Sequence, residues 1–288
     1  MRIARVLVVA VLGFCFLGII PVNGFRLDRP QQRLGYAHRT RPCSSAPCRQ
    51  SAEVALAAAR AETTFVNRRA TDAQSLPARN VAGYSCHDAG DVGHCYAITA
   101  ATGASYGFLA ADVSTVALNA QDQAFIDDEM WLIDAKCCWI EAGFMSNHTI
   151  ATKNPLYFWA QGVGNHVVVS YFGGLDATQY GRPAHIQLDG NNGTFHALIV
   201  PPGSNAAFSS GDVTIRMSPN AVNLGQELSG TNGSHAPRAL FTRIRVGALA
   251  PGRPPDSKFK ITIASPPTGG WLVVPGQSRE PVFYTECC

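Results

Sequence analysis

The sequence of 288 residues lacks several features that would assign it to a common functional class. Its charges nearly balance, with 23 Lys and Arg against 20 Asp and Glu, and it has no basic stripe with interleaved aromatic residues. Nucleic acid is therefore not an expected partner, because surfaces that bind it concentrate positive charge. The chain also has no H-E-x-x-H motif and no phosphate-cradling glycine loop, which argues against zinc-peptidase and nucleotide chemistry. Accordingly, we expect neither a metal nor a cofactor.

Long apolar runs are also scarce, and the one that exists lies at the N-terminus. Arg2 and Arg5 precede an apolar stretch over residues 6–20, and small or turn-forming residues follow as far as Gly24. This pattern predicts a signal peptide over residues 1–24, cleaved after Gly24. A spanning helix requires about 20 apolar residues, so an uncleaved anchor is the weaker alternative. We expect a secreted protein, with the vacuole as a second destination, and no membrane contact after cleavage. Three sequons fit a eukaryotic secretory route: Asn147, Asn192 and Asn232.

The cysteines also suit an oxidising compartment. Cys15 leaves with the signal peptide, and an even number remains in pairwise spacing. The first four could close two short local loops, which leaves the two doublets for each other. We expect long-range bonds between the doublets rather than a vicinal bond, because adjacent side chains diverge on a strand. The disulfide candidates are Cys43, Cys48, Cys86, Cys95, Cys137, Cys138, Cys287 and Cys288.

Two histidines inside one of these pairs raise the alternative of a metal site. His87 and His94 lie just within Cys86 and Cys95, in the segment CHDAGDVGHC. Zinc sites usually take a second pair of ligands from further along the chain, whereas all four side chains here belong to one ten-residue loop. A hairpin closed by a disulfide is the favoured interpretation.

Residues 25–80 differ in composition from the rest and are expected to form a leader or propeptide. Its low apolar content predicts partial disorder, with one short helix expected over residues 51–62. A dibasic pair, Arg68-Arg69, suggests cleavage there. An arm that is never cut is an equally good interpretation.

Residues 81–288 are predicted to be all-β. Short runs of β-branched and aromatic residues alternate with turn-forming clusters, with no long helical period and no internal repeat. This texture predicts a two-sheet antiparallel β-sandwich of the jelly-roll or concanavalin-like type. The expected strands cover residues 95–101, 111–118, 130–135, 138–144, 156–161, 166–172, 184–188, 194–200, 213–217, 222–228, 239–246, 259–264, 271–274 and 282–284.

Two of these strands carry acids beside glycines. In WIEAGF, Glu141 shares a face with Trp139 and Gly143, while the alternate residues are apolar and belong in the core between the sheets. In VNLGQEL, Glu227 lies two residues from Gly225 on one face. Each strand thus leaves open space next to a carboxylate.

From about Ala111 to Val246 the chain resembles the catalytic domain of neprosin-type glutamic peptidases, which are secreted β-sandwich endopeptidases. The resemblance rests on motifs in the family's order: MWLI (130–133), WIEAGF (139–144), YFW (157–159), GQEL (225–228) and LFTRIR (240–245). It implies that Glu141 and Glu227 are the catalytic acids. Two departures are a leader too short for the plant activation domain and Gln226 in place of a glycine.

The resemblance implies hydrolysis of a polypeptide substrate, with a preference for cleavage after proline as one option. Two acids a few ångströms apart cannot both ionise cheaply, so one keeps its proton and activity should be confined to acidic pH. Trp139 and Trp159 are candidates for the wall of a substrate groove, with a core position as the alternative for either. Gln226 would narrow the site or add a hydrogen-bond donor.

The sequence leaves rival functions open, and the first of them uses the same residues. A non-catalytic sandwich could bind glycans or cell-wall polymer through exposed tryptophans and a few acids. An extracellular structural or effector protein would need no site, and a scattered Ser/His/Asp triad is a further alternative. The sequence is silent on oligomeric state.

Overall fold

The structure is a computed structural model, and it describes residues 41–60, 94–102, 105–114, 118, 125–147, 154–164, 166–191, 193–229, 239–247, 272–275 and 283–286. The expected signal peptide, the Arg68-Arg69 pair and the strand expected over residues 259–264 lie outside these ranges. No helix within them has the length and apolar character needed to cross a membrane.

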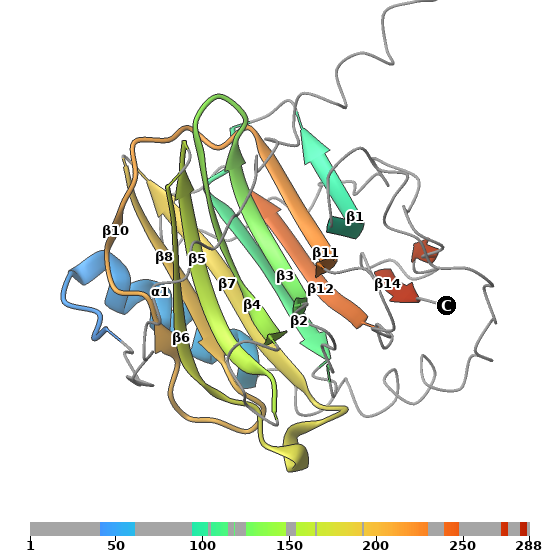
Figure 1. Cartoon of the computed structure of the whole chain (residues 1–288). Helices are drawn as coiled ribbons and strands as arrows, with labels where there is room; N and C mark the ends of the chain where they lie inside the picture. The colour runs from blue at the N-terminus through green and yellow to red at the C-terminus, as the bar shows by residue number, and fades with distance from the viewer. Residues whose placement is uncertain are drawn as a thin grey trace, which may run out of the picture.

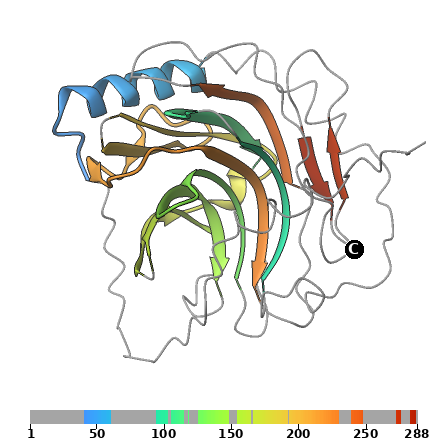
Figure 2. The same ribbon diagram turned by 90° about the horizontal axis from the view of Figure 1, so that it is seen from above.

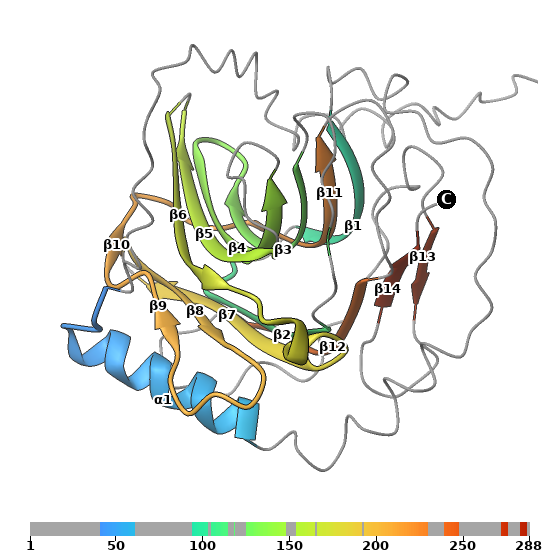
Figure 3. The same ribbon diagram turned by 60° about the horizontal axis from the view of Figure 1, so that its bottom comes forward.

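Two antiparallel sheets form the body of the molecule, which confirms the predicted two-sheet sandwich (Figure 1). The first, called the front sheet here, has six strands in the order β1-β11-β3-β4-β5-β6. Its members are β1 (His94–Thr102), β11 (Ala221–Ser229), β3 (Phe125–Asp134), β4 (Cys138–Asn147), β5 (Leu156–Val163) and β6 (His166–Gly174). This sheet curves strongly, and its concave side faces away from the other sheet (Figure 3).

The second sheet, called the back sheet, has the order β10-β8-β7-β2-β12-β14-β13, with β9 paired to β8. Its strands are β2 (Phe108–Ser114), β7 (Pro183–Asn191), β8 (Thr194–Val200), β9 (Phe208–Ser209), β10 (Val213–Thr214), β12 (Ala239–Gly247), β13 (Leu272–Pro275) and β14 (Phe283–Glu286). A 3₁₀ turn, η3 (Ala177–Gln179), lies between β6 and β7.

The hydrophobic core lies between the sheets, as the layers in Figure 2 show. On β4 the alternate residues Ile140, Ala142 and Phe144 are fully buried in it, as the period-two pattern predicted. The opposing layer comes from β2, β7 and β8, including Ile186 and Phe195. The inward face of the front sheet is mostly apolar, with Asp128 and Gln226 as buried polar exceptions, and the acids on the alternate positions of β3, β4 and β11 are directed to the concave outer face.

One helix, α1 (Ala46–Arg60), covers the outer face of the back sheet (Figures 1 and 3). Its buried Ala55 packs against Leu198 and Val200 of β8. The sequence predicted a helix here but started it at residue 51 and placed it in a leader. The helix begins at Ala46 and packs on the back sheet with its small apolar face over β7 and β8, while its place in a removable leader stays a prediction.

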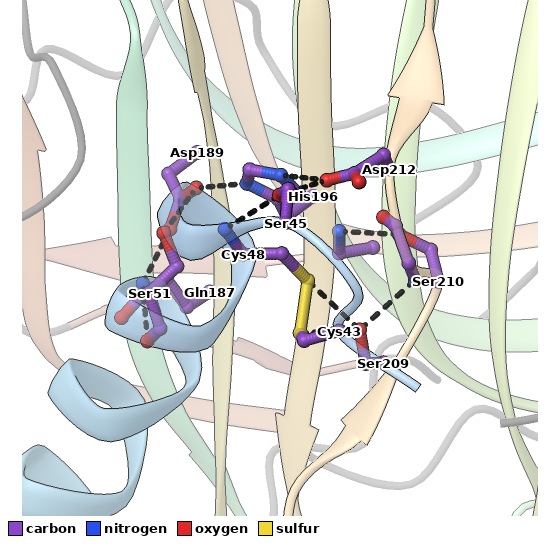
Figure 4. Close-up of polar contacts among 12 residues, drawn as sticks. Cys43, Ser45, Cys48, Ser51, Gln187, Asp189, His196, Ser209, Ser210 and Asp212 are labelled. Atoms are coloured by element: carbon purple, nitrogen blue, oxygen red, sulfur yellow. Dashed lines mark hydrogen bonds and ion pairs between the residues drawn. A yellow bond between two sulfur atoms is a disulfide. The ribbon is translucent and has the colours of Figure 1, made fainter. Parts of the chain in front are cut away.

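A buried polar network fastens this helix and the segment before it to the back sheet (Figure 4). His196 lies between two carboxylates, with Nδ1 2.9 Å from Asp189 and Nε2 2.9 Å from Asp212. From the helical side, the hydroxyl of Ser51 donates to Asp189 at 2.9 Å and that of Ser45 donates to Asp212 at 2.6 Å. We call these five residues the back-sheet network.

A second anchor joins the helix to the neighbouring strands. The buried carboxylate of Asp112 pairs with Nδ1 of His185 at 2.7 Å and with the guanidinium of Arg243. Arg243 also donates to the backbone oxygen of Ala58 in α1 at 2.8 Å. The residue lies at an irregularity of β12 with φ of 49°, a conformation that releases its side chain from the regular pleat.

The disulfides confirm one expectation and overturn another. Cys43 and Cys48 are bonded, as their spacing predicted. Cys137 and Cys138 are bonded to each other, so the expectation of long-range bonds from this doublet was wrong. The physical reason is that Cys137 lies in the turn before β4 rather than on a strand, so the two side chains do not alternate across a pleat. The remaining four candidates, Cys86, Cys95, Cys287 and Cys288, are not described at the level of side chains, and the pairing of Cys86 with Cys95 stays a prediction.

Candidate functional site

Three neighbouring strands of the front sheet bring four carboxyl groups together on its outer face. In the register, Glu227 of β11 lies opposite Asp127 of β3, and Glu141 of β4 lies opposite Trp131 of β3. Glu129 lies on β3 midway between those two positions. Alternate residues of a strand share a face, so all four side chains leave the sheet on the same side. We call Asp127, Glu129, Glu141 and Glu227 the carboxyl cluster.

Glycines make room at the centre of this cluster. Glu129 faces Gly143 on one neighbouring strand and Gly225 on the other. At Gly143 an added Cβ would lie 2.1 Å from the backbone oxygen of Asp128, a distance that no side chain tolerates. The two glycines noted in the sequence therefore flank the central acid, and Gly143 also lets β4 approach β3 closely.

Burial makes the carboxyl cluster electrostatically unusual. Asp127 and Glu129 are each 1% exposed, while Glu141 is 8% and Glu227 is 6% exposed. Oδ1 of Asp127 and both carboxyl oxygens of Glu129 have no partner in good hydrogen-bonding geometry among the described residues. Buried carboxylates without donors are costly, so protons are the expected neutralising groups.

The pKa values follow from this burial. Loss of hydration holds the pKa of Asp127, Glu129 and Glu141 well above the ordinary range, and the neighbouring charges add to it. For Glu141 the added repulsion comes from Glu227, while the side chain of Glu129 acts in the opposite direction and lowers the pKa. Asp127, Glu129 and Glu141 thus keep protons above the pH at which free carboxylic acids lose them.

Two tryptophans lie beside the acids. Trp139 shares the outer face of β4 with Glu141, and its ring stacks on Trp131 with centroids 5.9 Å apart and planes 17° apart. The indole of Trp139 also lies across Gly162 of β5, where a Cβ would come within 2.3 Å of the ring. Both rings are half-buried, so an aromatic surface adjoins the carboxyl cluster.

Two residues predicted to bind substrate do not face this site. Trp159 is 3% exposed and belongs to the core between the sheets, because it lies opposite Ala142, whose side chain points inward. Gln226 is fully buried and shares its face with Asp128, which it lies opposite in the register. Burial raises the pKa of Asp128, and Gln226 partly offsets that effect. Neither residue can therefore line the site as expected.

Asp127 and Glu129 were missed by the sequence analysis. The expected strand began at Met130, so the acidic run Asp127-Asp128-Glu129 was left outside it. The available signal was alternation, because extending the strand backwards by three residues places Asp127 and Glu129 on the face of Trp131.

Metal binding was considered for two groups of side chains. Carboxyl oxygens of Asp127, Glu129 and Glu227 lie within 4.8 Å of one another, which a hard cation could span. Acid proximity alone does not make a metal site, and we assign none of these residues as ligands. The second group contains Cys48, His196 and Asp212, but Cys48 is bonded to Cys43 and offers no thiolate.

One sequence match to a serine-nucleophile pattern lacks the required context. Gly103-Ala-Ser-Tyr-Gly107 fits G-x-S-x-G, in which the serine occupies a sharp turn from a strand into a helix. Here Ser105 follows β1 and precedes β2, so the segment connects two strands. The pattern therefore gives no support to a serine hydrolase.

Comparison with known proteins identifies the fold but no sequence family. No family profile matches the chain, and no curated protein matches it in sequence. Among solved structures, scytalido-glutamic peptidase with a transition-state analogue inhibitor aligns with a TM-score of 0.50 at 9% identity, covering 67% of this chain and 98% of that one. SCP-B, a member of the eqolisin family of peptidases in complex with the tripeptide Ala-Ile-His, aligns with a TM-score of 0.42 at 10% identity, covering 69% and 99%. The first of these alignments shows that the chain has a glutamic-peptidase-like fold.

Proposed function

We propose that the protein is a secreted glutamic endopeptidase that hydrolyses peptide bonds at acidic pH, with Glu141 and Glu227 as its essential acids. The observation that carries this proposal is the carboxyl cluster on the concave outer face of the front sheet. Four buried acids are gathered there, and burial holds the pKa of three of them, Asp127, Glu129 and Glu141, well above the ordinary range. The glutamic-peptidase-like fold and the neprosin-type motifs agree with it.

The chemistry requires two carboxyl groups in opposite protonation states. One ionised carboxylate removes a proton from a water molecule, whose oxygen then forms a bond to the carbonyl carbon of the substrate. One protonated carboxyl donates its proton as the carbonyl oxygen gains charge or as the amine leaves. The peptide C–N bond breaks, and the two products take up the elements of one water. No cofactor is needed for this balance.

The raised pKa values support an acidic working range. A cluster whose carboxyls keep protons above their usual range contains a neutral acid at mildly acidic pH, where an isolated glutamate would already be ionised. At higher pH the last proton leaves and the general acid is lost. We expect activity to fall as the pH rises towards neutrality.

Two further features agree with this assignment. The half-buried Trp139 beside Glu141 offers an aromatic surface on which an apolar side chain or a proline ring could stack, in line with the post-proline preference of the neprosin type. The Cys43–Cys48 disulfide is consistent with secretion or a vacuolar location.

The test is cleavage of an unfolded protein substrate from pH 3 to pH 7 by the wild type, Glu141→Gln and Glu227→Gln. Each glutamine keeps the shape of the side chain but cannot exchange the required proton, so each variant should lose about 100-fold or more in rate. Activity that survives either substitution would reject the paired-acid mechanism.

A second candidate function rests on the stacked Trp131–Trp139 pair. Aromatic surfaces next to acids also bind sugars, so a non-catalytic glycan-binding role is the alternative. Binding to cell-wall polysaccharide that persists in Glu141→Gln and disappears in Trp139→Ala, together with an inactive wild type, would favour it.

A further inference from the structure

The start of α1 is joined to the back sheet through one carboxylate oxygen. Oδ1 of Asp212, which precedes β10, accepts a hydrogen bond from the hydroxyl of Ser45 at 2.6 Å and lies 2.9 Å from Nε2 of His196 (Figure 4). Ser45 immediately precedes α1, and its hydroxyl oxygen accepts a hydrogen bond from the backbone N–H of Cys48 at 3.1 Å. Ser45 therefore caps the helix, and Asp212 connects this cap with His196.

Both ring nitrogens of His196 face carboxylates. From β7, Oδ1 of Asp189 lies 2.9 Å from Nδ1, and Asp212 lies at the same distance from Nε2. From α1, the sulfur of Cys48 lies within 4.8 Å of the ring, but it is bonded to Cys43 and does not titrate. A carboxylate only accepts, so both contacts are hydrogen bonds only while both nitrogens carry a proton. The arrangement thus requires the positively charged form of His196.

The two carboxylates differ in what surrounds them. The side chain of Asp189 is 2% exposed, and it also accepts hydrogen bonds from Ser51 and Gln187. The side chain of Asp212 is 29% exposed, so water can replace a lost donor there. A neutral His196 therefore keeps its remaining proton on Nδ1, next to the buried Asp189, and turns a lone pair on Nε2 towards Asp212. Because a lone pair and a carboxylate repel each other, the contact with Asp212 is the one that breaks.

The sign of the pH dependence follows from the same contacts. Burial lowers the pKa of His196, but Asp189 and Asp212 outweigh it and the net pKa is raised. The pKa of Asp212 is lowered, first of all by the hydrogen bond from Ser45, so this carboxylate is ionised throughout the range in which histidine titrates. The contact between His196 and Asp212 is therefore present below the folded pKa of His196 and is lost as the pH rises through it.

The rest of α1 has attachments that do not use this proton. Near the other end of the helix, the guanidinium of Arg243 donates to the backbone oxygen of Ala58 at 2.8 Å. Between the two ends, Ala55 packs against Leu198 and Val200. An arginine keeps its charge at every pH that proteins tolerate, and apolar contacts do not titrate. Loss of the His196 proton should therefore loosen the start of the helix without detaching the whole helix.

We propose that His196 is a pH-sensitive attachment: its protonated ring holds the start of α1, residues 44–48, on the back sheet through Asp212 and Ser45, and its deprotonation releases that segment. The chain thus has a docked form of this segment at acidic pH and a released form at alkaline pH. This inference does not depend on the peptidase assignment, because none of the residues involved belongs to the carboxyl cluster.

The experiment measures amide hydrogen exchange in the full chain at pH 5.5 and pH 8.5, with each rate corrected for the intrinsic effect of pH. The amides of Cys48 and Arg49 report on the start of α1, because they are bonded to Ser45, and those of residues 57–60 are the internal reference. Nitrogen NMR of the imidazole ring reports the protons of His196. The test variant is Asp212→Asn. The matched control is Asp176→Asn, which changes the cap of η3 instead.

In the wild type, we expect His196 to carry a proton on both nitrogens at pH 5.5 and on Nδ1 alone at pH 8.5. Protection of the Cys48 and Arg49 amides should fall about tenfold between these pH values, because a charge-assisted hydrogen bond is lost. In Asp212→Asn, the new side-chain amide can donate to a neutral Nε2 while its oxygen accepts from Ser45, so protection should not change with pH. Asp176→Asn should behave as the wild type.

Three results would overturn the inference. The first is constant protection in the wild type while Nε2 of His196 loses its proton, and the second is a His196 that still holds both protons at pH 8.5. The third is a pH-dependent fall in Asp212→Asn as large as that in the wild type, which would exclude the route through Asp212. An equal fall at residues 57–60 would also contradict the inference, because it would mean that the whole helix detaches.

Discussion

The buried acidic side chains of the two sheets have opposite kinds of neighbours. On the back sheet, Asp112 pairs with His185 and Arg243, and Asp189 pairs with His196. On the front sheet, the carboxyl cluster gathers acids beside one another, and among the described residues no cation lowers the pKa of Asp127, Glu129 or Glu141. Paired acids hold elements in place, whereas unpaired buried acids must keep protons.

The pKa values express this difference. Burial tends to raise the pKa of Asp112, but His185 and Arg243 outweigh it and the net pKa is lowered. Burial tends to lower the pKa of His196, but Asp189 and Asp212 outweigh it and the net pKa is raised. For Asp127 and Glu129, burial and the neighbouring acids outweigh the lowering by the Glu227 backbone and by Trp131, respectively, and both pKa values are raised.

These shifts predict how stability depends on pH. An acid with a lowered pKa, such as Asp112, contributes stability above its unfolded value of about 4, which is lost as the pH falls through its folded value. His196, with a raised pKa, contributes stability below about 6.5, which is lost as the pH rises through its folded value. Asp127, Glu129 and Glu141, with their raised pKa values, destabilise the fold as the pH rises from about 4. Stability should therefore be greatest at mildly acidic pH.

The largest expected effect comes from breaking the back-sheet network. Asp189→Ala leaves His196, Ser51 and Gln187 without the carboxylate that all three contact, at 2.9, 2.9 and 2.5 Å. We expect the free energy of unfolding to fall by about 3–5 kcal/mol, measured by urea denaturation at pH 5.5. Asp212→Ala is the matched control, and because Asp212 is partly exposed it should lose about 1 kcal/mol. Equal losses of stability in the two variants would contradict the expectation that the contribution of each aspartate depends on its burial.

A smaller loss is expected from closing the space at the front sheet. Gly143→Ala places a methyl group 2.1 Å from the backbone oxygen of Asp128, so β3 and β4 must move apart beside the carboxyl cluster. We expect a loss of about 1–3 kcal/mol in stability together with reduced cleavage. At Gly174 the nearest atom would lie at 3.8 Å, so Gly174→Ala should be nearly neutral. Unchanged activity in the folded Gly143→Ala protein would show that strand spacing there does not set the site.

Removing a buried acid that has no cationic partner should increase the free energy of unfolding rather than lower it. Asp128→Asn replaces a fully buried carboxyl whose pKa burial raises, with Gln226 still beside it. At pH 7 the variant should be more stable than the wild type, by about 1.4 kcal/mol for each unit by which burial raises the pKa of Asp128. Near pH 3, where both carboxyl states are protonated, the two proteins should be equally stable. Thermal unfolding at both pH values measures this, and a variant less stable at pH 7 would contradict the assigned shift.

The smallest effect is expected at the vicinal disulfide. A bond between Cys137 and Cys138 closes almost no loop, so it constrains the unfolded chain very little. The double substitution Cys137→Ser, Cys138→Ser should change the free energy of unfolding, measured by urea denaturation, by less than about 1 kcal/mol. A large loss would mean that the pair supports the β3–β4 turn in another way.

Alternation along single strands was readable from the sequence, and relations between strands were not. The period-two pattern placed Glu141 and Trp139 on one face and Phe144 on the other, as the structure does. Trp159 obeys the same period, but its face is fixed by its register with β4, which no local pattern reveals. Gln226 was misjudged because adjacency in sequence was taken for adjacency in space.

The N-terminal segment shows a second limit of this kind. Its helix was visible from composition, but its docking depends on Ser51 and Ser45 meeting acids more than 130 residues away. Such contacts leave no trace in a local pattern. Removal of a propeptide that includes α1 would therefore have to break the back-sheet network, and α1 packs on the back sheet, whereas the carboxyl cluster belongs to the front sheet.

The contrast between the sheets is tested most directly by measuring peptide cleavage and thermal unfolding together, from pH 3 to pH 8, on Glu141→Gln and Asp189→Asn. We predict that Glu141→Gln loses cleavage at every pH while its unfolding temperature is unchanged or raised above pH 5. Asp189→Asn should lose stability while cleaving peptide normally wherever it remains folded. Cleavage retained by Glu141→Gln, or abolished in folded Asp189→Asn, would contradict the assignment of catalysis to the front sheet.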